Sequence, residues 1–455
     1  MEKFKWIQQH ILTSLAEGKL KKGDRLMSVR EGAKFYGASP ATVLKAYEGL
    51  IIESVVHNQP RKGYFIIDAP GKLTVNHQVD FRSPNPSGEL LPFTDFKRCV
   101  NAALGNLEHA VFQYADPFGL ASLRDAVAKQ LTENQVFVSS EEIAITSGSQ
   151  QAIDILFKMT YPSGGKVILL EQPTYPGALR AAENNRQEVI FVERTREGLD
   201  LERVERLFRT KDVKCFYVMP RFHNPTGHSL DIATRKRLYE LACQYNVYLI
   251  EDDYLVDMDN CVKLPPIKHF DTEGRVIYLK SFSKVFMPGL RLAALVLPKR
   301  IKEAFKTYKQ WSDISTNALS QGALEVYLTS GMFKEHVTRA KKAYTARVLK
   351  LKRIVEQHGD SRMHPLFLEG SILGSLTLDS AIHIDQLLRH LEAQGIVISD
   401  TRYGFHPYFQ QNNLLRICVT RVGIESIETY FPLVLEAVSQ ALDRGYEIRK
   451  ATEYM

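Results

Sequence analysis

The sequence predicts an α/β chain of two domains: a small helical domain with a β-hairpin, then a larger domain built on a mainly parallel sheet. Three observations support this. Residues 1–68 contain three helical patterns and two short β-rich runs. From residue 80 onward, seven short β-rich runs alternate with helical segments, which is typical of a parallel sheet covered on both faces. Polar or aromatic residues follow five of these runs, at the sheet edge where ligands bind.

The composition excludes several other classes of protein. The chain has 455 residues, 44% hydrophobic and 24% charged, as in ordinary globular proteins. No apolar run approaches the roughly 18 to 20 residues of a membrane span, so no membrane partner is expected. Five widely spaced cysteines without a CxxC pair argue against a zinc site or a disulfide framework and favour the cytoplasm. Residues 1–72 hold 12 basic and 7 acidic side chains, so 12 − 7 = +5 of the net charge of +7 lies there, which indicates a polyanionic partner.

The first helix is expected over about residues 2–17. Its apolar residues recur at spacings of three and four, and Gly18 supplies a stop. A second, short helix is expected in SVREGAKFY, where Ser28 is the N-cap and Glu31 completes a capping box. Ser39 then caps a third helix, PATVLKAYEGLIIE, with proline at its first position. The residues expected to be buried on that helix are Val43, Leu44, Tyr47 and Leu50 or Ile51.

Two β-rich runs, SVVHN and GYFII, follow the third helix. The segment QPRKG joins them, so a hairpin with a basic tip at Arg61 and Lys62 is expected. Three helices and a hairpin in this order form a winged helix–turn–helix. Its third helix fits the DNA major groove, and the basic tip can reach phosphates or the minor groove.

The same residues resemble the GntR family of bacterial transcription regulators over about residues 5–68. The stretches that carry the resemblance are GDRLMSVREGA, GASPATVLKAYEGL and RKGYFII. Met27 replaces the usual proline, and Pro40 stands where an arginine is common, which changes the expected DNA sequence rather than the fold. The resemblance implies binding to double-stranded promoter DNA. The residues it suggests as DNA contacts are Arg30, Thr42, Lys45 and Arg61, with Lys62 beside the last.

A Pro- and Gly-marked boundary separates the two domains. We expect a DNA-binding domain at 1–68, a linker at 69–80 and the large domain at 81–455. A dozen extended residues reach only about 40 Å, so the linker keeps the domains close. The large domain is expected to have a main part at about 110–310 and a smaller α+β part at about 320–455.

Five strand ends in the large domain carry residues suited to a ligand. The runs SGSQQ, QPTYPG, RFHNPTG, EDDY and SFSK each follow one of the apolar runs, and SFSK contains Lys284. Carboxyl ends of parallel strands meet at one edge of a sheet, so these residues are expected to form one site. A lysine in apolar surroundings is costly unless it is paired or neutral, and a neutral amine can attack an aldehyde.

With these motifs, residues 80 to about 445 resemble the fold-type I aminotransferases, which bind pyridoxal 5′-phosphate. Together with the GntR-like head, nearly the whole chain resembles the MocR subfamily of regulators. Lys284 matches the family's Schiff-base lysine. Asp252 matches the carboxylate that holds the pyridine proton, with Asp253 as the alternative. Three further matches concern the cofactor ring: Tyr254 and Asn224 to its 3-oxygen, and Tyr175 to its face.

The phosphate arm requires backbone N–H groups and a guanidinium. The resemblance assigns this role to Gly148, Ser149 and Gln150 at a helix start, and to Ser281 and Arg291. Tyr114 resembles the tyrosine that reaches the phosphate of a neighbouring subunit, which implies a homodimer. Arg416 matches the arginine that binds the α-carboxylate of an amino acid, with Arg402 and Arg421 as competitors.

These expectations combine into a transcription regulator that senses pyridoxal 5′-phosphate or a small amino compound through aldimine exchange at Lys284. One alternative is an active aminotransferase with an accessory DNA-binding head. Another is a sensor of the cofactor alone, without an amino ligand.

Overall fold

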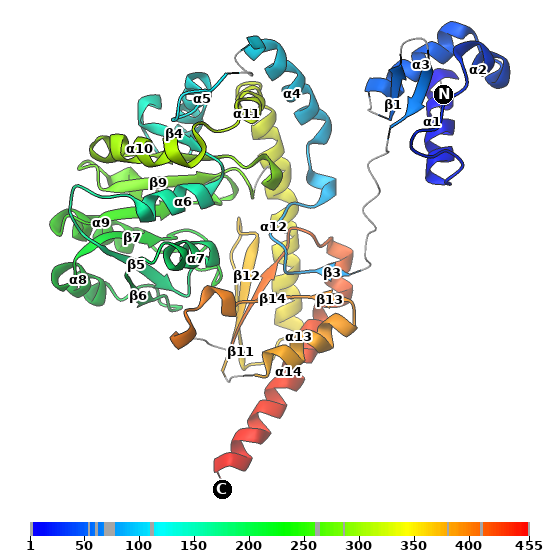
Figure 1. Cartoon of the computed structure of the whole chain (residues 1–455). Helices are drawn as coiled ribbons and strands as arrows, with labels where there is room; N and C mark the ends of the chain where they lie inside the picture. The colour runs from blue at the N-terminus through cyan, green and yellow to red at the C-terminus, as the bar shows by residue number, and fades with distance from the viewer. Residues whose placement is uncertain are drawn as a thin grey trace. The chain divides into compact units, whose positions relative to one another are not determined.

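The computed structural model describes residues 3–52, 55–59, 62–67, 78–109, 113–259, 264–284, 287–379, 382–409 and 413–453. The chain forms two compact units, Met1–His77 and Gln78–Met455, which are coloured from blue to red along the chain in Figure 1. No helix in these described ranges combines the length and the apolar character needed to cross a membrane.

The first unit contains three helices and a hairpin, as the sequence predicts. Its elements are α1 (Lys3–Ala16), α2 (Val29–Tyr36), α3 (Pro40–Ile52), β1 (Val56–Gln59) and β2 (Gly63–Ile66), and the two strands are antiparallel. The capping box is confirmed, since the Glu31 amide donates to Ser28 Oγ and the Ser28 amide donates to the Glu31 carboxylate. Ser39 Oγ likewise accepts a hydrogen bond from the Thr42 amide at the start of α3.

One detail of α3 differs from the prediction. Val43, Tyr47 and Leu50 are buried against α1 residues such as Ile7, but Leu44 is 38% exposed. Ala46 takes the expected place of Leu44 in the core. The reason is the helical period, because residue 44 is turned about 100° from residue 43, whereas 46, 47 and 50 share its face.

The second unit is built on a seven-stranded sheet in the order β4-β10-β9-β8-β7-β5-β6. All pairs from β9 to β6 are parallel, whereas β10 is antiparallel to both of its neighbours. The seven predicted runs provide its strands, and the prediction of a mainly parallel sheet is confirmed. The strands are β4 (Ile143–Thr146), β5 (Val167–Gln172), β6 (Val189–Glu193), β7 (Val213–Val218), β8 (Tyr248–Asp252), β9 (Val276–Ser281) and β10 (Ala293–Val296).

Helices cover both faces of this sheet (Figure 1). Side chains alternate along β7: Cys215 and Tyr217 join the larger apolar core, whereas Phe216 and Val218 join the smaller one. The smaller core is closed by α8 (Leu201–Thr210) and α9 (Ile232–Gln244). The larger core continues into the C-terminal part, and its helices before that part are α4 (Phe93–Leu107), α5 (Ala121–Thr132), α6 (Ser149–Lys158), α7 (Pro176–Asn184), α10 (Lys302–Asp313), α11 (Ala318–Thr329) and α12 (Met332–His358).

The C-terminal part carries a smaller antiparallel sheet in the order β11-β12-β15-β14. A parallel pair beside it joins β3, close to the start of the unit, to β13 (Figure 1). The elements of this part are β3 (Val79–Asp80), β11 (Met363–Phe367), β12 (Leu373–Leu378), α13 (Ile384–Ala393), β13 (Ile396–Val397), β14 (Ser399–Asp400), β15 (Leu414–Cys418) and α14 (Ile424–Glu453). The first residues of the unit are therefore packed on its last part.

Candidate functional site

The carboxyl ends of the parallel strands open onto a cavity of about 210 Å³. The ends of β4, β5, β7, β8 and β9 contribute residues because the chain leaves the sheet at that edge: α6 begins after β4, and Tyr175 follows β5. Ten residues that the sequence predicts for the site line this one cavity. They are Ser149, Gln150, Tyr175, Asn224, Asp252, Tyr254, Ser281, Lys284, Arg291 and Arg416.

The cavity also distinguishes between alternatives that the sequence leaves open. Asp252 lines it, whereas the Asp253 carboxylate accepts hydrogen bonds from Arg221 Nε at 3.0 Å and from the Tyr278 hydroxyl at 3.1 Å. Arg416 lines it as well, whereas Arg402 is paired with Asp400 and Asp385, and Arg421 with Asp80. Asp252 and Arg416 are therefore the two candidates that a ligand in this cavity can reach.

One oxygen of the Asp252 carboxyl group accepts a hydrogen bond from the protein, and the other does not. Tyr217 donates its hydroxyl proton to Asp252 Oδ2 at 2.5 Å, whereas Oδ1 is buried and has no hydrogen-bond partner. Burial raises the pKa of Asp252 to about 7, although the bond from Tyr217 works against this rise. An unpaired buried oxygen aimed at a cavity fits a cationic N–H group of a ligand, such as a protonated pyridine.

Sequence reasoning missed Tyr217. It lies inside the buried strand β7, where an aromatic residue signals packing. The signal that was available is its position next to β8: Tyr217 pairs with Ile250, two residues before Asp252, and has the same parity in the alternation of the strand.

Lys284 follows β9 and its ammonium faces an environment that disfavours charge. Burial lowers the pKa of Lys284, and the nearby guanidiniums of Arg416 and Arg291 lower it further. The Asp252 carboxylate acts in the opposite direction without cancelling the effect. A lysine with a lowered pKa has a larger fraction of neutral, nucleophilic amine at neutral pH.

Another group of the cavity's lining residues is suited to a phosphate. Ser149 begins α6, and its buried hydroxyl oxygen has no hydrogen-bond partner. Gly148, just before it, has φ +83°, and a Cβ there would lie 2.5 Å from Arg291 Nη2. Only a glycine therefore lets the guanidinium of Arg291 approach this helix start so closely. Backbone N–H groups, a hydroxyl and a guanidinium are a donor set that suits a dianion.

Hydrogen bonds hold the Asn224 side chain and the loop that carries it. Arg416 Nη1 donates to Asn224 Oδ1 at 3.0 Å, so the amide N–H₂ group remains for a ligand. Tyr254 donates its hydroxyl to the Phe222 carbonyl at 2.7 Å, close to this loop, and Ser375 Oγ donates to the Thr226 carbonyl at 2.7 Å. The loop that carries Asn224 is thus tied both to the segment after β8 and to the smaller sheet.

Tyr114 does not line the cavity of its own chain. Its side chain is 82% exposed, and the Ala115 amide that follows donates to Ser315 Oγ at 3.3 Å. The role expected for Tyr114 lies in a second copy of the chain.

The predicted DNA contacts lie in the first unit. Arg30, Lys45 and Lys62 are exposed, and the Lys45 ammonium lies 4.2 Å from the centre of the Phe4 ring. Thr42 is half-buried, and its hydroxyl lies 2.8 Å from Ser39 Oγ. The remaining predicted contact, Arg61, lies outside the described residues.

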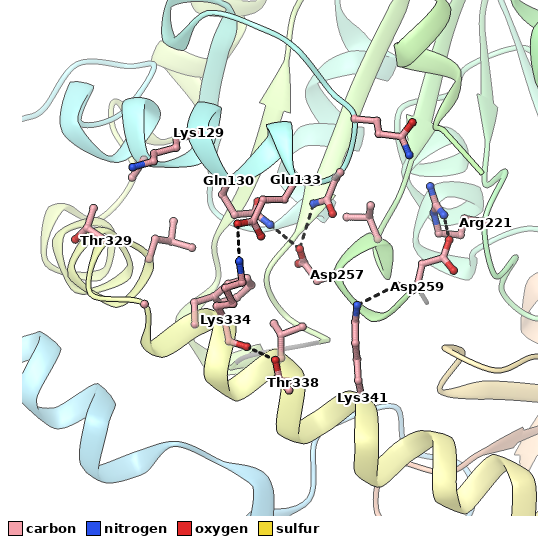
Figure 2. Close-up of a pocket in the computed structure, with 18 of the residues that line it drawn as sticks. Lys129, Gln130, Glu133, Arg221, Asp257, Asp259, Thr329, Lys334, Thr338 and Lys341 are labelled. Atoms are coloured by element: carbon pink, nitrogen blue, oxygen red, sulfur yellow. Dashed lines mark hydrogen bonds and ion pairs between the residues drawn. The ribbon is translucent and has the colours of Figure 1, made fainter. Parts of the chain in front are cut away.

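A second cavity, of about 470 Å³, lies between α5, α12 and the segment after β8 (Figure 2). None of the predicted site residues lines it. Its carboxylates already have partners: Glu133 pairs with Lys334, Asp257 with Lys280, and Asp259 with Arg221. In Figure 2, Gln130 points at Asp257, and its side-chain amide donates to that carboxylate at 2.7 Å. The carboxylates of this cavity are therefore already paired with basic side chains of the same chain.

Comparison with known proteins finds a family match for each of the two units of the chain. Residues 77–427 match the family "Aminotransferase class I and II". Residues 5–66 match "Bacterial regulatory proteins, gntR family".

Among related proteins, the uncharacterized HTH-type transcriptional regulator YcxD of Bacillus subtilis (strain 168) is 36% identical over 443 residues. These cover 96% of this chain and 99% of that protein. The probable rhizopine catabolism regulatory protein MocR of Rhizobium meliloti is 23% identical over 484 residues, which cover 96% of each chain.

Among solved structures, the kynurenine aminotransferase of Pyrococcus horikoshii in complex with PMP superimposes with a TM-score of 0.73 at 26% identity. The match covers 80% of this chain and 92% of that one. A match along nearly the full length of YcxD and the two family matches lead to one assignment. The chain belongs to the aminotransferase class I and II family, and the gntR-family domain at its N-terminus gives it the architecture of the MocR subfamily of transcription regulators.

Proposed function

We propose that this protein is a cytoplasmic transcription regulator that binds promoter DNA through residues 1–68. Residues 81–455, joined to them by the linker 69–80, bind pyridoxal 5′-phosphate and sense either that cofactor or a small amino compound. The observation that carries the proposal is the cavity in which Lys284 lies beside the open oxygen of Asp252 and the phosphate-type donor set at Arg291.

The cofactor, when bound, supplies an aldehyde that reacts with primary amines and a ring that withdraws electrons once it is protonated. Lys284 provides the chain's own amine, and burial keeps part of it neutral. Asp252 Oδ1 would hold a proton on the ring nitrogen, while Tyr217 keeps the carboxylate oriented through Oδ2. Asn224 and Tyr254 would bind the 3-oxygen of the cofactor, and Tyr175 would lie against its ring.

At the phosphate, Ser149 and Gln150 supply the helix start, and Ser281 and Arg291 complete the donor set. Tyr114 of a second copy is proposed to reach the same phosphate, so the acting form is a homodimer; the exposure of Tyr114 supports this. Arg416 binds the carboxylate of an amino-acid effector. An effector shifts DNA binding only by its difference in affinity for two conformations of the protein.

We expect DNA retention to respond to ligands that occupy the cavity. Promoter fragments from the operon next to the gene are titrated with the full chain, first with pyridoxal 5′-phosphate alone and then with a panel of L-amino acids. A change with the cofactor alone favours cofactor sensing, and a change only with an amino acid favours amino-compound sensing. Unchanged retention under every condition would contradict sensing through this cavity.

The basic residues of the first unit should act through phosphates. Lys45→Gln and Lys62→Gln are each expected to weaken DNA binding and to reduce the slope of log K against log[salt] by about 1, because each removes one cationic contact. The matched control is Lys19→Gln, since the Lys19 ammonium is already paired with Glu17 at 2.6 Å. A salt slope that stays at the wild-type value in both variants would rule out these contacts.

A second candidate is an active aminotransferase with an accessory DNA-binding head. Ten of the predicted site residues line one cavity, which is compatible with catalysis as well as sensing. Steady turnover with an amino donor and a keto acceptor, together with no DNA retention at low salt, would favour this candidate over the regulator.

A further inference from the structure

The last residues of the expected linker and those that follow it form a segment that ends at the cavity, which we call the strap (residues 79–84). Pro84 is one of the residues that line the cavity. The strap begins as β3, two residues after the end of the first unit at His77. A ligand in the cavity is thus adjacent to the peptide that continues toward the DNA-binding unit.

Backbone hydrogen bonds dock the strap on the C-terminal part. The Val79 amide donates to the Gly395 carbonyl at 2.8 Å, and Phe81 joins Val397 and Cys418 through its amide and carbonyl at 2.8 and 2.7 Å. The Phe81 side chain is fully buried. The Asp80 carboxylate folds the next turn, since it accepts from the Arg82 amide at 2.8 Å and the Ser83 amide at 3.0 Å.

Two side chains from the end of β15 and the residues after it complete the docking. Thr420 Oγ1 donates to the Ser83 carbonyl at 2.8 Å. Arg416 Nη2 donates to the Arg82 carbonyl at 3.0 Å, while Nη1 is engaged with Asn224 and Nε is buried without a partner. The guanidinium proposed for the effector carboxylate therefore also holds the strap.

We propose that a carboxylate ligand and the strap compete for Arg416, so that an amino-acid effector loosens residues 79–84 and lengthens the tether to the DNA-binding domain. A carboxylate takes two parallel N–H groups of a guanidinium and brings a full negative charge, whereas the Arg82 carbonyl accepts one N–H group and brings only a dipole. The Arg82 carbonyl oxygen carries partial negative charge and opposes a carboxylate beside it. Six released residues add up to about 20 Å of reach to the linker.

This inference rests on the proposed function for its biological meaning, but its physical content is tested without cofactor chemistry. The probe is 4-methylpentanoate, which has a carboxylate and no amine, and the neutral control is 4-methylpentanamide at equal ionic strength. Hydrogen exchange of peptides covering residues 78–87 is measured on the full chain. The carboxylate is expected to raise exchange at the Phe81, Arg82 and Ser83 amides about two- to tenfold, and the amide to leave it unchanged.

Thr420→Val tests the competition from the side of the strap. Valine keeps the shape of the side chain and removes the donor to Ser83, together with the 3.4 Å contact between the Thr420 hydroxyl and Cys418 Sγ. Thr377→Val in β12 is the matched control because Thr377 lies in the same small sheet away from the strap. Coupling between two sites is reciprocal, so Thr420→Val should bind 4-methylpentanoate about two- to tenfold more tightly than wild type. It should also shift promoter retention, without effector, in the direction in which the effector shifts it for wild type.

Three results would overturn the proposal: weaker or unchanged carboxylate binding in Thr420→Val, strap exchange that falls on adding the carboxylate, or a shift of promoter retention opposite to that of the effector. The exchange and binding experiments remain decisive even if Lys284 proves to hold no cofactor. A failure of the proposed function and a failure of the strap are therefore separable.

Discussion

A Lys284→Ala chain should carry no covalent pyridoxyl label after incubation with pyridoxal 5′-phosphate and borohydride, whereas the wild type should carry it at Lys284. The reason is that Lys284 is the one lysine among the described residues that line the cavity, and burial keeps part of its amine neutral. Peptide mass analysis locates the label, and the absorbance of the bound cofactor is read in parallel. The ligand response of DNA retention should disappear in the same variant.

The control for this experiment is Lys299→Ala, because Lys299 is exposed and lies outside the cavity. It should be labelled at Lys284 as efficiently as the wild type. A label on another lysine in the wild type, or a normal ligand response of DNA retention in Lys284→Ala, would show that Lys284 is not the attachment point.

The second large effect is expected for Asp252→Asn, which should weaken retention of the cofactor about tenfold or more at neutral pH. A neutral amide cannot hold the proton of the ring nitrogen by charge, and each pKa unit by which Asp252 stabilises that proton corresponds to a factor of ten in affinity for the protonated ring. Asparagine has nearly the same shape as aspartate, and its Oδ1 can still accept the hydrogen bond from Tyr217. Equilibrium dialysis or absorbance titration measures the loss.

The same substitution should change the stability of the cofactor-free chain in the opposite direction. Burial raises the pKa of Asp252 from 3.8 to about 7, so the folded state binds this proton more tightly than the unfolded state. The resulting stability is fully present below pH 3.8 and is lost as the pH rises to about 7. At pH 8 the wild type therefore lacks a contribution of up to a few kcal/mol, at about 1.4 kcal/mol per pKa unit, that Asp252→Asn does not lose.

Thermal unfolding at several pH values checks this prediction. Burial also raises the pKa of Glu171 and of Glu251 to about 7, so the wild type and the variant share part of the pH dependence. The difference between the two chains isolates Asp252, and it should grow from pH 4 to pH 7 and then level off. A difference that is constant with pH, or a variant that is less stable at pH 8, would contradict a raised pKa at Asp252.

Local sequence signals were sufficient for the elements of the first unit and for the seven strands of the large sheet, but not for the strands of the smaller sheet. Ser28 with Glu31 and Ser39 with Pro40 mark helix starts because a cap acts on backbone groups within three residues. The seven β-rich runs became seven strands of one sheet, and the rule that parallel strands end at a common edge brought Tyr175, Asp252 and Lys284 to one cavity. Their chemical roles stay predictions that the experiments above test.

What the sequence by itself determined is therefore the order of the elements in the first unit and in the large sheet, the two family resemblances and the set of residues at one sheet edge. The tertiary structure alone decided which of two adjacent carboxylates faces the cavity: Asp253 is engaged by Arg221, and Asp252 keeps an open oxygen. It alone joined Arg416 to Asn224, 192 residues away, and to Arg82, 334 residues away. The physical reason is the distance along the sequence over which each interaction acts. Helix caps and hydrophobic periodicity act over a few residues, whereas the partner of a buried charge depends on which distant segments pack around it.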